Sequence, residues 1–326
     1  MKLRQLFRLL GITLVGAVLL LLATVGVVLG ISLSADDCAP EYNYSAQSAR
    51  LRQHVETLCN QPRYGDSKEH ARKYIEEELR RAGWEVSRQY FTTSDGEQHC
   101  NLSAIRRGKS PQRYIIGAHY DACDTDEGNP GADDNASAVA VLLELARTLP
   151  PGTPEQTIEL VAWDCEEPPY YDTEDMGSTH HATACTPAEV RGLICLEMLG
   201  YFSHEEGSQP PLFPGHSLLL PTVGNFVAIV GDWNALSLGR QAYTALRTQL
   251  PVVRINIPFS HSSDLYLSDH RNYAPRGIPA IMVTDTAMLR NPNYHEPSDT
   301  PETLNYNYMA RVTHGVTQLV QTLAGT

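Results

Sequence analysis

The chain has 326 residues, of which 42% are apolar and 19% charged, so a globular protein with a sizeable core is expected and extensive disorder is not. Its formal net charge is -13 at pH 7, from 25 Lys and Arg against 38 Asp and Glu. Because proteins that bind nucleic acid neutralise phosphates with basic surfaces, this charge balance excludes nucleic acid as the expected partner.

The N-terminal segment is predicted to be a membrane anchor. Lys2, Arg4 and Arg8 precede an uncharged apolar run over residues 9–35. As a helix rising about 1.5 Å per residue, the run would span roughly 40 Å, enough to cross a lipid bilayer. The preceding basic residues predict that the rest of the chain lies outside the cytoplasm, in the periplasm or the extracellular space. The alternative is a secretory signal cleaved near Ser32–Ser34. Because a signal core has only about 7–15 apolar residues, an uncleaved anchor is favoured.

Helical and strand patterns alternate along the rest of the chain. A polar linker is expected over residues 36–50, and a long Pro- and Gly-rich loop over residues 207–224. The predicted helices cover residues 67–81, 136–149, 232–250 and 300–323. The predicted strands cover residues 84–91, 101–106, 113–118, 157–163, 193–199, 225–230 and 280–283. This alternation predicts an α/β fold, a three-layer sandwich in which helices flank a mixed, mostly parallel sheet.

Side chains that can bind metal ions follow the predicted apolar strands. They are His119 and Asp121, Asp133 and Asp134, Glu166 and Glu167, Glu197, and His295. In open α/β sheets, binding sites form at the carboxyl ends of the strands. Imidazoles and carboxylates together are typical zinc ligands, whereas none of the seven cysteines forms the CxxC pair of a structural zinc ribbon. His180 and His181 fall on a short predicted helix and are expected to be structural.

Two adjacent pairs of carboxylates offer the groups that a two-zinc site needs. Two zinc ions about 3.5–4 Å apart require a carboxylate that bridges them. Asp133 or Asp134 could supply it, while the other caps the helix that follows. A further carboxylate must take a proton from the attacking water, and Glu166 and Glu167 can divide ligation and proton transfer because successive side chains at a strand end point different ways.

Glu197 stands in the apolar run over residues 193–199. A buried glutamate without a partner is destabilising, and a metal ion would provide that partner.

Six strings of the sequence resemble the secreted bacterial di-zinc aminopeptidases, whose fold also occurs in glutamate carboxypeptidases and glutaminyl cyclases. The strings occupy residues 117–121, 131–137, 166–169, 176–178, 268–270 and 294–300. The resemblance extends over residues 101–306, and the strings are specific as a set rather than one by one.

The resemblance implies two Zn²⁺ ions per chain and assigns their ligands. His119 and Glu197 would bind the first ion, Glu167 and His295 would bind the second, and Asp134 would bridge the two. The family usually has an aspartate where this chain has Glu197, so the extra methylene leaves the occupancy of the first position open. Of the two adjacent aspartates, the resemblance selects Asp134 rather than Asp133 as the bridge.

Three catalytic roles are also implied by the resemblance. Glu166 would be the general base that takes the proton of the attacking water. Asp121 would orient His119 and fix its tautomer. Tyr294, next to the last ligand, would donate a hydrogen bond to the oxyanion.

The expected activity is metal-dependent hydrolysis of the N-terminal bond of peptides that have a free N-terminus. The catalytic domain would cover residues 36–326, after an anchor or signal over residues 1–35 that contacts the lipid bilayer. One alternative is a glutaminyl cyclase, which holds one zinc ion and closes an N-terminal Gln; the Glu-Glu-Pro-Pro and Asp-Asp-Asn strings favour the peptidase. A non-catalytic relative is the other alternative, and it is disfavoured because every expected position has a competent ligand.

Overall fold

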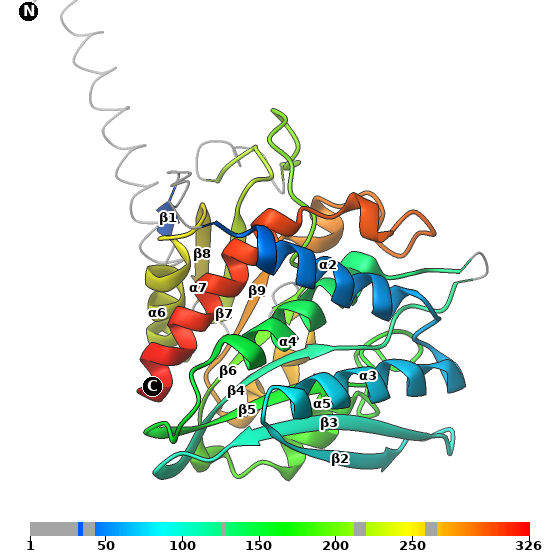
Figure 1. The fold of residues 1–326 in the computed structure, drawn as a ribbon, viewed down its shortest axis with the longest axis vertical. Coiled ribbons are helices and arrows are strands. Elements are labelled where there is room, and N and C mark those ends of the chain that lie inside the picture. The colour runs from blue at the N-terminus through cyan, green and yellow to red at the C-terminus, as the bar shows by residue number, and fades with distance from the viewer. Residues whose placement is uncertain (1–31, 35–42, 126–127, 212–219, 258–265) are drawn as a thin grey trace, which may run out of the picture.

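The structure is a computed structural model that describes residues 32–34, 43–125, 128–211, 220–257 and 266–326. Within these ranges, nine strands form one mixed sheet in the order β1-β8-β7-β9-β6-β4-β5-β3-β2 (Figure 1). The strands are β1 (Ser32–Ser34), β2 (Glu85–Thr92), β3 (Gln98–Arg106), β4 (Ser110–His119), β5 (Gln156–Trp163), β6 (Val190–Glu197), β7 (Val227–Asp232), β8 (Val252–Ile257) and β9 (Ala280–Thr284).

Helices cover both faces of the sheet. They are α2 (Ser45–Cys59), α3 (Lys68–Arg81), α4 (Ala138–Thr148), α5 (Gly177–Ala184), α6 (Leu236–Leu246) and α7 (Tyr306–Ala324). Side chains alternate along each strand, so Ile116 and Ile194 face the larger core under α2, α3, α4, α6 and α7, whereas Ile115 and Cys195 face the smaller core under α5. The predicted α/β sheet flanked by helices is therefore confirmed.

The sheet is parallel only in part. Four of its eight pairings are parallel: β4 with β5, β4 with β6, β6 with β9, and β7 with β8. The other four are antiparallel, among them the β2–β3 hairpin, whose short connection permits no parallel pairing. The prediction of a mixed sheet is confirmed, but its parallel share is half of the pairings rather than most of them.

Most of the predicted membrane helix lies outside the described residues. Its last part, Ser32–Ser34, forms the edge strand β1 and pairs antiparallel with β8. The prediction of a helix is therefore wrong for these three residues. Arg254 donates to Ser32 Oγ at 2.7 Å, and Tyr243 Oη donates to the carbonyl of Leu33 at 2.7 Å. Among the helices that the structure describes, none is long and apolar enough to cross a bilayer.

Two elements were not predicted from the sequence. The expected linker over residues 36–50 ends early, because α2 begins at Ser45 and packs on α4 and α7, where Leu51, Val55 and Leu58 are buried. Those three side chains are spaced along a helix that is otherwise polar, which hides the apolar stripe. Strand β8 was also missed, and its Arg254 and Asn256 interrupt the apolar pattern although both are buried.

Two helices begin later than predicted. Helix α7 begins at Tyr306 rather than at Thr300, because Pro301–Thr303 form a separate 3₁₀ turn. Asn305 caps α7 by accepting the backbone N–H of Tyr308. Helix α6 begins at Leu236, four residues after the predicted start.

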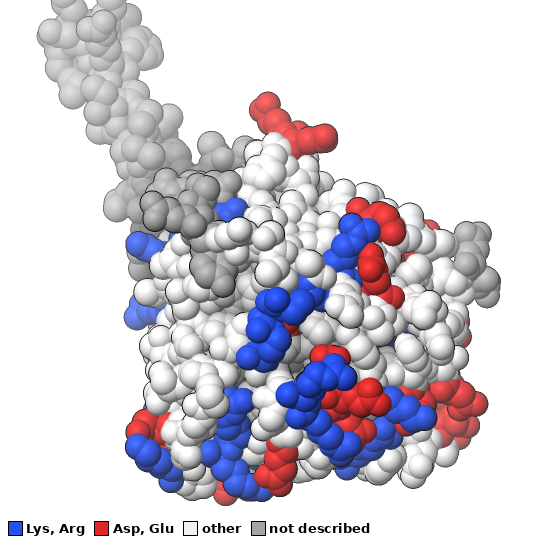
Figure 2. Space-filling model, viewed as in Figure 1, with Lys and Arg blue, Asp and Glu red and all other residues white. Residues whose placement is uncertain are grey.

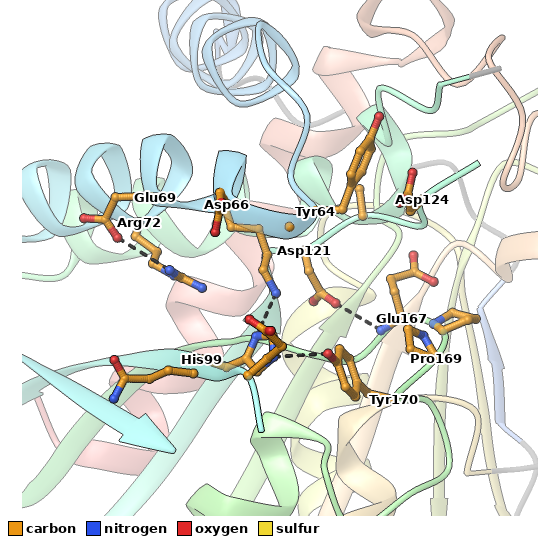
Figure 3. Close-up of a pocket in the computed structure, with 16 residues that line it drawn as sticks. Tyr64, Asp66, Glu69, Arg72, His99, Asp121, Asp124, Glu167, Pro169 and Tyr170 are labelled. Atoms are coloured by element: carbon orange, nitrogen blue, oxygen red, sulfur yellow. Dashed lines mark hydrogen bonds and ion pairs between the residues drawn. The ribbon is translucent and has the colours of Figure 1, made fainter. Parts of the chain in front are cut away.

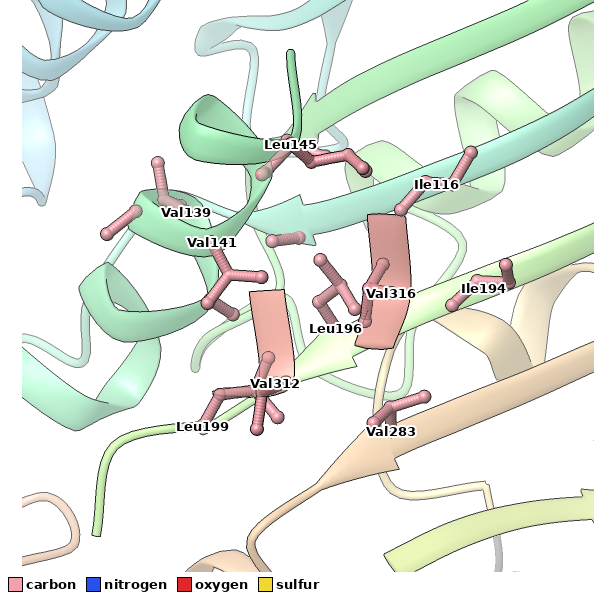
Figure 4. Packing of buried hydrophobic residues seen from close by; sticks show 14 of the residues in the cluster. Ile116, Val139, Val141, Leu145, Ile194, Leu196, Leu199, Val283, Val312 and Val316 are labelled. Atoms are coloured by element: carbon pink, nitrogen blue, oxygen red, sulfur yellow. The ribbon is translucent and has the colours of Figure 1, made fainter. Parts of the chain in front are cut away.

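The larger core fixes α4 and α7 on the strands that carry the candidate site. Val139 and Leu145 of α4 and Val316 of α7 pack with Ile116 of β4 and Leu196 of β6 (Figure 4). All five side chains are fully buried, and each contributes about 1.5–3 kcal/mol relative to an exposed position. The ends of β4 and β6 are thereby held in a fixed relation.

On the face shown in Figure 2, charges of both signs are interspersed over the lower half of the molecule. Lys109, for example, contacts Glu155 at 2.6 Å, and both side chains are exposed. Pairs of this kind that are exposed to solvent contribute only about 0–1 kcal/mol each. They therefore shape the surface more than they stabilise the fold.

A buried ion pair lies under the sheet, between His181 of α5 and Glu159 of β5, with Nε2 and Oε1 3.2 Å apart. Burial by itself lowers the pKa of His181, but its hydrogen bonds to Cys185 and Glu159 outweigh burial and raise the pKa from 6.5 to about 9. Tyr273 Oη lies 2.7 Å from His181 Nδ1. These contacts confirm that His181 has structural partners.

This pair predicts a loss of stability at alkaline pH. Because the pKa of His181 is raised on folding, its contribution is complete below pH 6.5 and disappears as pH rises through about 9. The contribution is on the order of 3 kcal/mol. His181→Gln, which cannot titrate, should remove this part of the slope when the free energy of unfolding is measured by denaturant titration from pH 6 to 10. His70→Gln is the control and should retain the wild-type slope; equal slopes in all three proteins would contradict the assignment.

Candidate metal centre

The predicted ligands come together at one edge of the sheet. The carboxyl ends of the parallel strands β4, β5 and β6 meet there, and two loops bring further side chains. The residues are His119 (the last of β4), Asp134 (before α4), Glu166 and Glu167 (after β5), Glu197 (the last of β6) and His295 (after β9). All except His295 are at least 93% buried.

His119 is surrounded by carboxylates. Its Nε2 lies 3.3 Å from Asp134 Oδ1, 3.5 Å from Glu197 Oε2 and 3.9 Å from Glu166 Oε2. A ligand atom of each of His119, Asp134 and Glu197 lies within 4.8 Å of the others, so the three could share one ion. We call the space between these three residues the first position.

His295 has a matching environment on the other side of Asp134. Its Nε2 lies 3.2 Å from Asp134 Oδ2 and 3.1 Å from Glu167 Oε2. We call the space between these three residues the second position. Asp134 thus turns one carboxylate oxygen to His119 and the other to His295, which is the arrangement that a bridging carboxylate requires.

The atoms at this centre fit a pair of divalent cations. His119 Nε2, His295 Nε2 and Glu167 Oε1 are buried and make no hydrogen bond within the described part of the chain. A buried polar atom without a partner is destabilising by roughly 1–3 kcal/mol, and a metal ion would remove that penalty. Imidazole nitrogen and carboxylate oxygen are the donors that zinc accepts.

The loop that carries Asp134 is held from two sides. Asp299 accepts the backbone N–H groups of Asp133 and Asp134 at 3.0 and 3.1 Å. Arg63, which is 1% exposed, donates to the carbonyls of Gly131 at 2.6 Å and Asp134 at 3.3 Å. A Cβ at Gly131, where φ is +60°, would lie 2.3 Å from the carbonyl oxygen of Asp134, so only glycine fits this turn.

Asp121 acts on both halves of the centre. Its Oδ1 lies 3.4 Å from His119 Nδ1, the position expected for a group that orients this imidazole. Its two oxygens also accept the backbone N–H groups of Glu166, at 3.3 Å, and of Glu167, at 3.1 Å. Asp121 therefore connects the end of β4 to the turn after β5, a contact that the sequence did not reveal.

Glu197 is held by polar side chains. Ser268 Oγ donates to Glu197 Oε2 at 2.6 Å, and Asn135 Nδ2 lies 3.4 Å from the same oxygen. Both residues belong to strings that the sequence had singled out, although neither was assigned a role. They hold Glu197 Oε2 in place 3.5 Å from His119 Nε2.

A cavity of about 370 Å³ lies beside the turn after β5 and shares Asp121 and Glu167 with the centre (Figure 3). His99, which lines this cavity, forms with Asp164 and Cys165 a further group of metal-binding side chains. The ammonium of Lys68 already occupies that group, 2.6 Å from Asp164 Oδ1 and 3.1 Å from His99 Nδ1. This group therefore supports the turn and is not a second metal centre.

An apolar pocket of about 160 Å³ opens on the other side of the centre, next to Glu166, Glu197 and Tyr294. The ring of Tyr294 stacks on that of His295, with centroids 3.8 Å apart and an interplanar angle of 17°. Burial and the nearby carboxylates raise the pKa of Tyr294 well above 10, so its phenol keeps the proton that it would donate. The remaining pocket walls are mainly aliphatic: Met198, Val230, Ile255, Met282, Met288 and Leu289.

Without metal, the histidines are strongly basic. Burial lowers the pKa of His295, but the close carboxylates of Asp134 and Glu167 outweigh burial and raise the pKa to about 10. Burial also lowers the pKa of His119. The negative charges of Glu197 and Glu166 outweigh burial, so the pKa of His119 is raised as well. Burial and the neighbouring Asp134 raise the pKa of Glu167 to about 8.

These shifts predict that zinc uptake releases protons. Because the raised pKa values keep His119 and His295 protonated at pH 7 in the metal-free protein, each ion must displace at least one proton. Zinc affinity should therefore rise with pH until about pH 10. Isothermal titration calorimetry in buffers of different ionisation enthalpy counts the protons, and His119→Gln should release fewer of them. Zinc binding with no net proton release would contradict this prediction.

All eight predicted site residues thus lie at one place, the ligands with Glu166, Asp121 and Tyr294 around them. The sequence did not reveal three further residues: Arg63, Asp299 and Cys123, whose Sγ lies near Glu167 and His295. Asp299 lies within a string already noted, and Cys123 is two residues beyond another; nothing in the sequence distinguished Arg63.

The sequence is similar to those of known proteins. Residues 101–320 match the profile of Peptidase family M28. The protein YfbL of Escherichia coli (strain K12) is 40% identical over 262 residues, which cover 78% of this chain and 80% of YfbL. A probable zinc metalloprotease of Leptosphaeria maculans is 25% identical over 234 residues, which cover 65% of this chain and 54% of that relative, so the chain spans about half of its length.

Solved structures share the fold. The glutaminyl cyclase of Fimbriiglobus ruber has a TM-score of 0.63 at 19% identity, covering 87% of this chain and 97% of its own. A leucine aminopeptidase precursor from Bacteroides thetaiotaomicron has a TM-score of 0.61 at 18% identity, covering 87% and 99%. At these identities the likeness shows a common fold and does not separate the two activities. The profile match, in contrast, spans most of the chain and includes all eight predicted site residues, and the chain belongs to peptidase family M28.

Proposed function

We propose that this protein is a zinc-dependent aminopeptidase with two zinc ions at the centre described above. The observation that carries the proposal is the placement of Asp134, whose two oxygens lie 3.3 Å from His119 Nε2 and 3.2 Å from His295 Nε2. One carboxylate placed between two imidazoles is the arrangement that a two-ion site uses as its bridge. Membership of peptidase family M28, and relatives named as probable zinc metalloproteases, support zinc and peptide hydrolysis.

In the proposed reaction, zinc would polarise the peptide carbonyl and make a water molecule more acidic. Glu166 accepts the proton of the attacking water and then donates it to the leaving amine. Its Oε2 is 3.9 Å from His119 Nε2, and it also lines the apolar pocket, so it lies between the metal ligands and the substrate. Tyr294 donates a hydrogen bond to the carbonyl oxygen as negative charge develops there.

The apolar pocket supports a preference for an apolar N-terminal residue. The carboxylates of Glu166 and Glu197 stand at one end of it and would attract the free amine of the substrate. Beyond them, side chains such as Met282 and Val230 offer no hydrogen bond to a charged group. A Lys or Asp side chain placed there would lose its hydration without compensation.

A single experiment tests the proposed activity. Zinc content is measured on the purified full-length protein, together with turnover of Leu-, Met-, Lys- and Asp-anilides and of a peptide that begins with Gln. We expect about two zinc ions per chain, cleavage with release of the N-terminal residue, and kcat/KM roughly tenfold or more higher for Leu and Met. Loss of ammonia from the Gln peptide without anilide cleavage would identify a cyclase, and absence of metal would identify a non-catalytic relative.

We also propose that the catalytic domain is held at a membrane, on its non-cytoplasmic side, by the uncleaved N-terminal segment. The basic residues and the apolar run before residue 32 support this proposal. Strand β1 supports it too, because cleavage after Ser34 would separate β1 from the chain and leave β8 without this partner. The intact mass of protein extracted from membranes should include residue 1. A mature N-terminus near Ala35 would favour secretion instead.

A further inference from the structure

Cys123 is a thiol at the second position that the proposed mechanism does not use. It lies on the loop that follows β4, four residues after His119, and is 9% exposed. Its Sγ, a carboxylate oxygen of Glu167 and a ring nitrogen of His295 all lie within 4.8 Å of one another. Three atom types that bind zinc, namely sulfur, oxygen and nitrogen, therefore face one small space.

A second observation shows that this space needs a cation. Glu167 is 3% exposed, and its Oε1 makes no hydrogen bond within the described part of the chain. His295 Nε2 is in the same situation, although Glu167 Oε2 lies 3.1 Å away. The thiol thus stands beside a buried carboxylate whose Oε1 has no hydrogen bond within the described residues, whereas Cys185, similarly buried, lies against His181 under the sheet.

We propose that Cys123 is a further ligand of the ion at the second position, through its thiolate. This inference rests on the proposed two-zinc function and adds a ligand to it. Thiolates select zinc and similar thiophilic ions such as Co²⁺ and Cd²⁺, whereas Mg²⁺ and Mn²⁺ prefer oxygen. The second position would therefore be the tighter and more zinc-selective of the two, because the first has only imidazole and carboxylate donors.

The proposal has a spectroscopic test. Metal-free full-length protein is titrated with Co²⁺, whose thiolate complexes have a charge-transfer band in the near ultraviolet that nitrogen and oxygen ligands do not give. In the wild type the intensity of this band should increase up to one equivalent of Co²⁺ and stay constant beyond it. Cys123→Ser and Cys123→Ala should both lack it, and Cys185→Ser, matched in burial, should keep it. Unchanged melting temperatures show that each variant is folded.

Metal selectivity gives a second measurement. Affinities are measured in competition with a chelator. Loss of a residue that only supports a metal ligand lowers metal affinity by about 10–100-fold, so loss of a ligand in Cys123→Ser should lower the Cd²⁺ affinity by at least as much. The Mn²⁺ affinity should change little. A wild type that binds two ions without a thiolate band overturns the role of Cys123 and leaves the proposed function intact. A wild type that binds no metal overturns both, and a band that persists in Cys123→Ser overturns the inference alone.

Discussion

Replacing Glu166 by Gln is expected to reduce turnover of a Leu-anilide by roughly 10²–10⁴-fold, while zinc content stays at the wild-type value. The carboxamide has nearly the same shape as the carboxylate but cannot accept a proton from water. Glu166 is 6% exposed, and Asp121 holds its backbone N–H at 3.3 Å, so the substituted side chain should keep its place. The change should therefore act on the proton transfer and not on the metal ligands.

The measurement is kcat together with zinc per chain by plasma emission spectrometry on the same sample. Glu205→Gln, at an exposed position that lines neither of the two pockets beside the centre, is the control and should be unchanged in both respects. Near-normal turnover in Glu166→Gln would refute the role of Glu166 as the base. Loss of zinc with loss of turnover would instead make Glu166 a ligand.

Replacing Asp134 by Asn is expected to remove tightly bound zinc from at least one position and to reduce turnover by roughly 10³-fold. An amide has one oxygen and one NH₂ group, so it can face only one of the two positions with an acceptor. Both carboxylate oxygens of Asp134 are in use, one toward His119 and one toward His295. The variant should therefore lose the connection between the two ions.

The adjacent aspartate provides a matched control. Asp133 is also fully buried, but its oxygens accept from Gly200 N–H at 2.8 Å and Asn291 Nδ2 at 2.8 Å, away from the metal ligands. Burial and the nearby Asp285 raise the pKa of Asp133, so loss of its charge is less costly than loss of the charge of a metal ligand. Asp133→Asn should keep two zinc ions and most of the activity. The reverse result, with zinc lost from Asp133→Asn only, would mean that Asp133 bridges the two ions and Asp134 does not.

The positions of the strands and of the ligands along the chain were predictable from the sequence. Strands such as β4 and β6 are buried on both faces in their second halves, so these halves appear as continuous apolar runs whose ends are marked by the first polar residues. His119 and Glu197 close β4 and β6, respectively. A side chain at the end of a buried parallel strand must lie at the common edge, which is why these residues could be assigned to one site before their distances were known.

Elements stabilised by distant contacts were not predictable. Helix α2 has a polar sequence and is held by packing on α4 and α7, so its local pattern indicated a linker. Arg63 is isolated in the sequence, yet it binds carbonyl groups about 70 positions further along the chain. Such contacts join segments with no short-range signature, and only the folded chain brings their atoms together.

By itself, then, the sequence determined an α/β protein with histidines and carboxylates at the ends of its strands, because burial and hydrogen bonding impose local periodicities that can be read along the chain. The tertiary structure decided which oxygen of Asp134 faces which histidine, that Asp121 holds the Glu166–Glu167 turn, and that Cys123 stands beside His295. Those relations depend on how separate loops pack at one edge of the sheet, and packing geometry is not encoded in residue spacing.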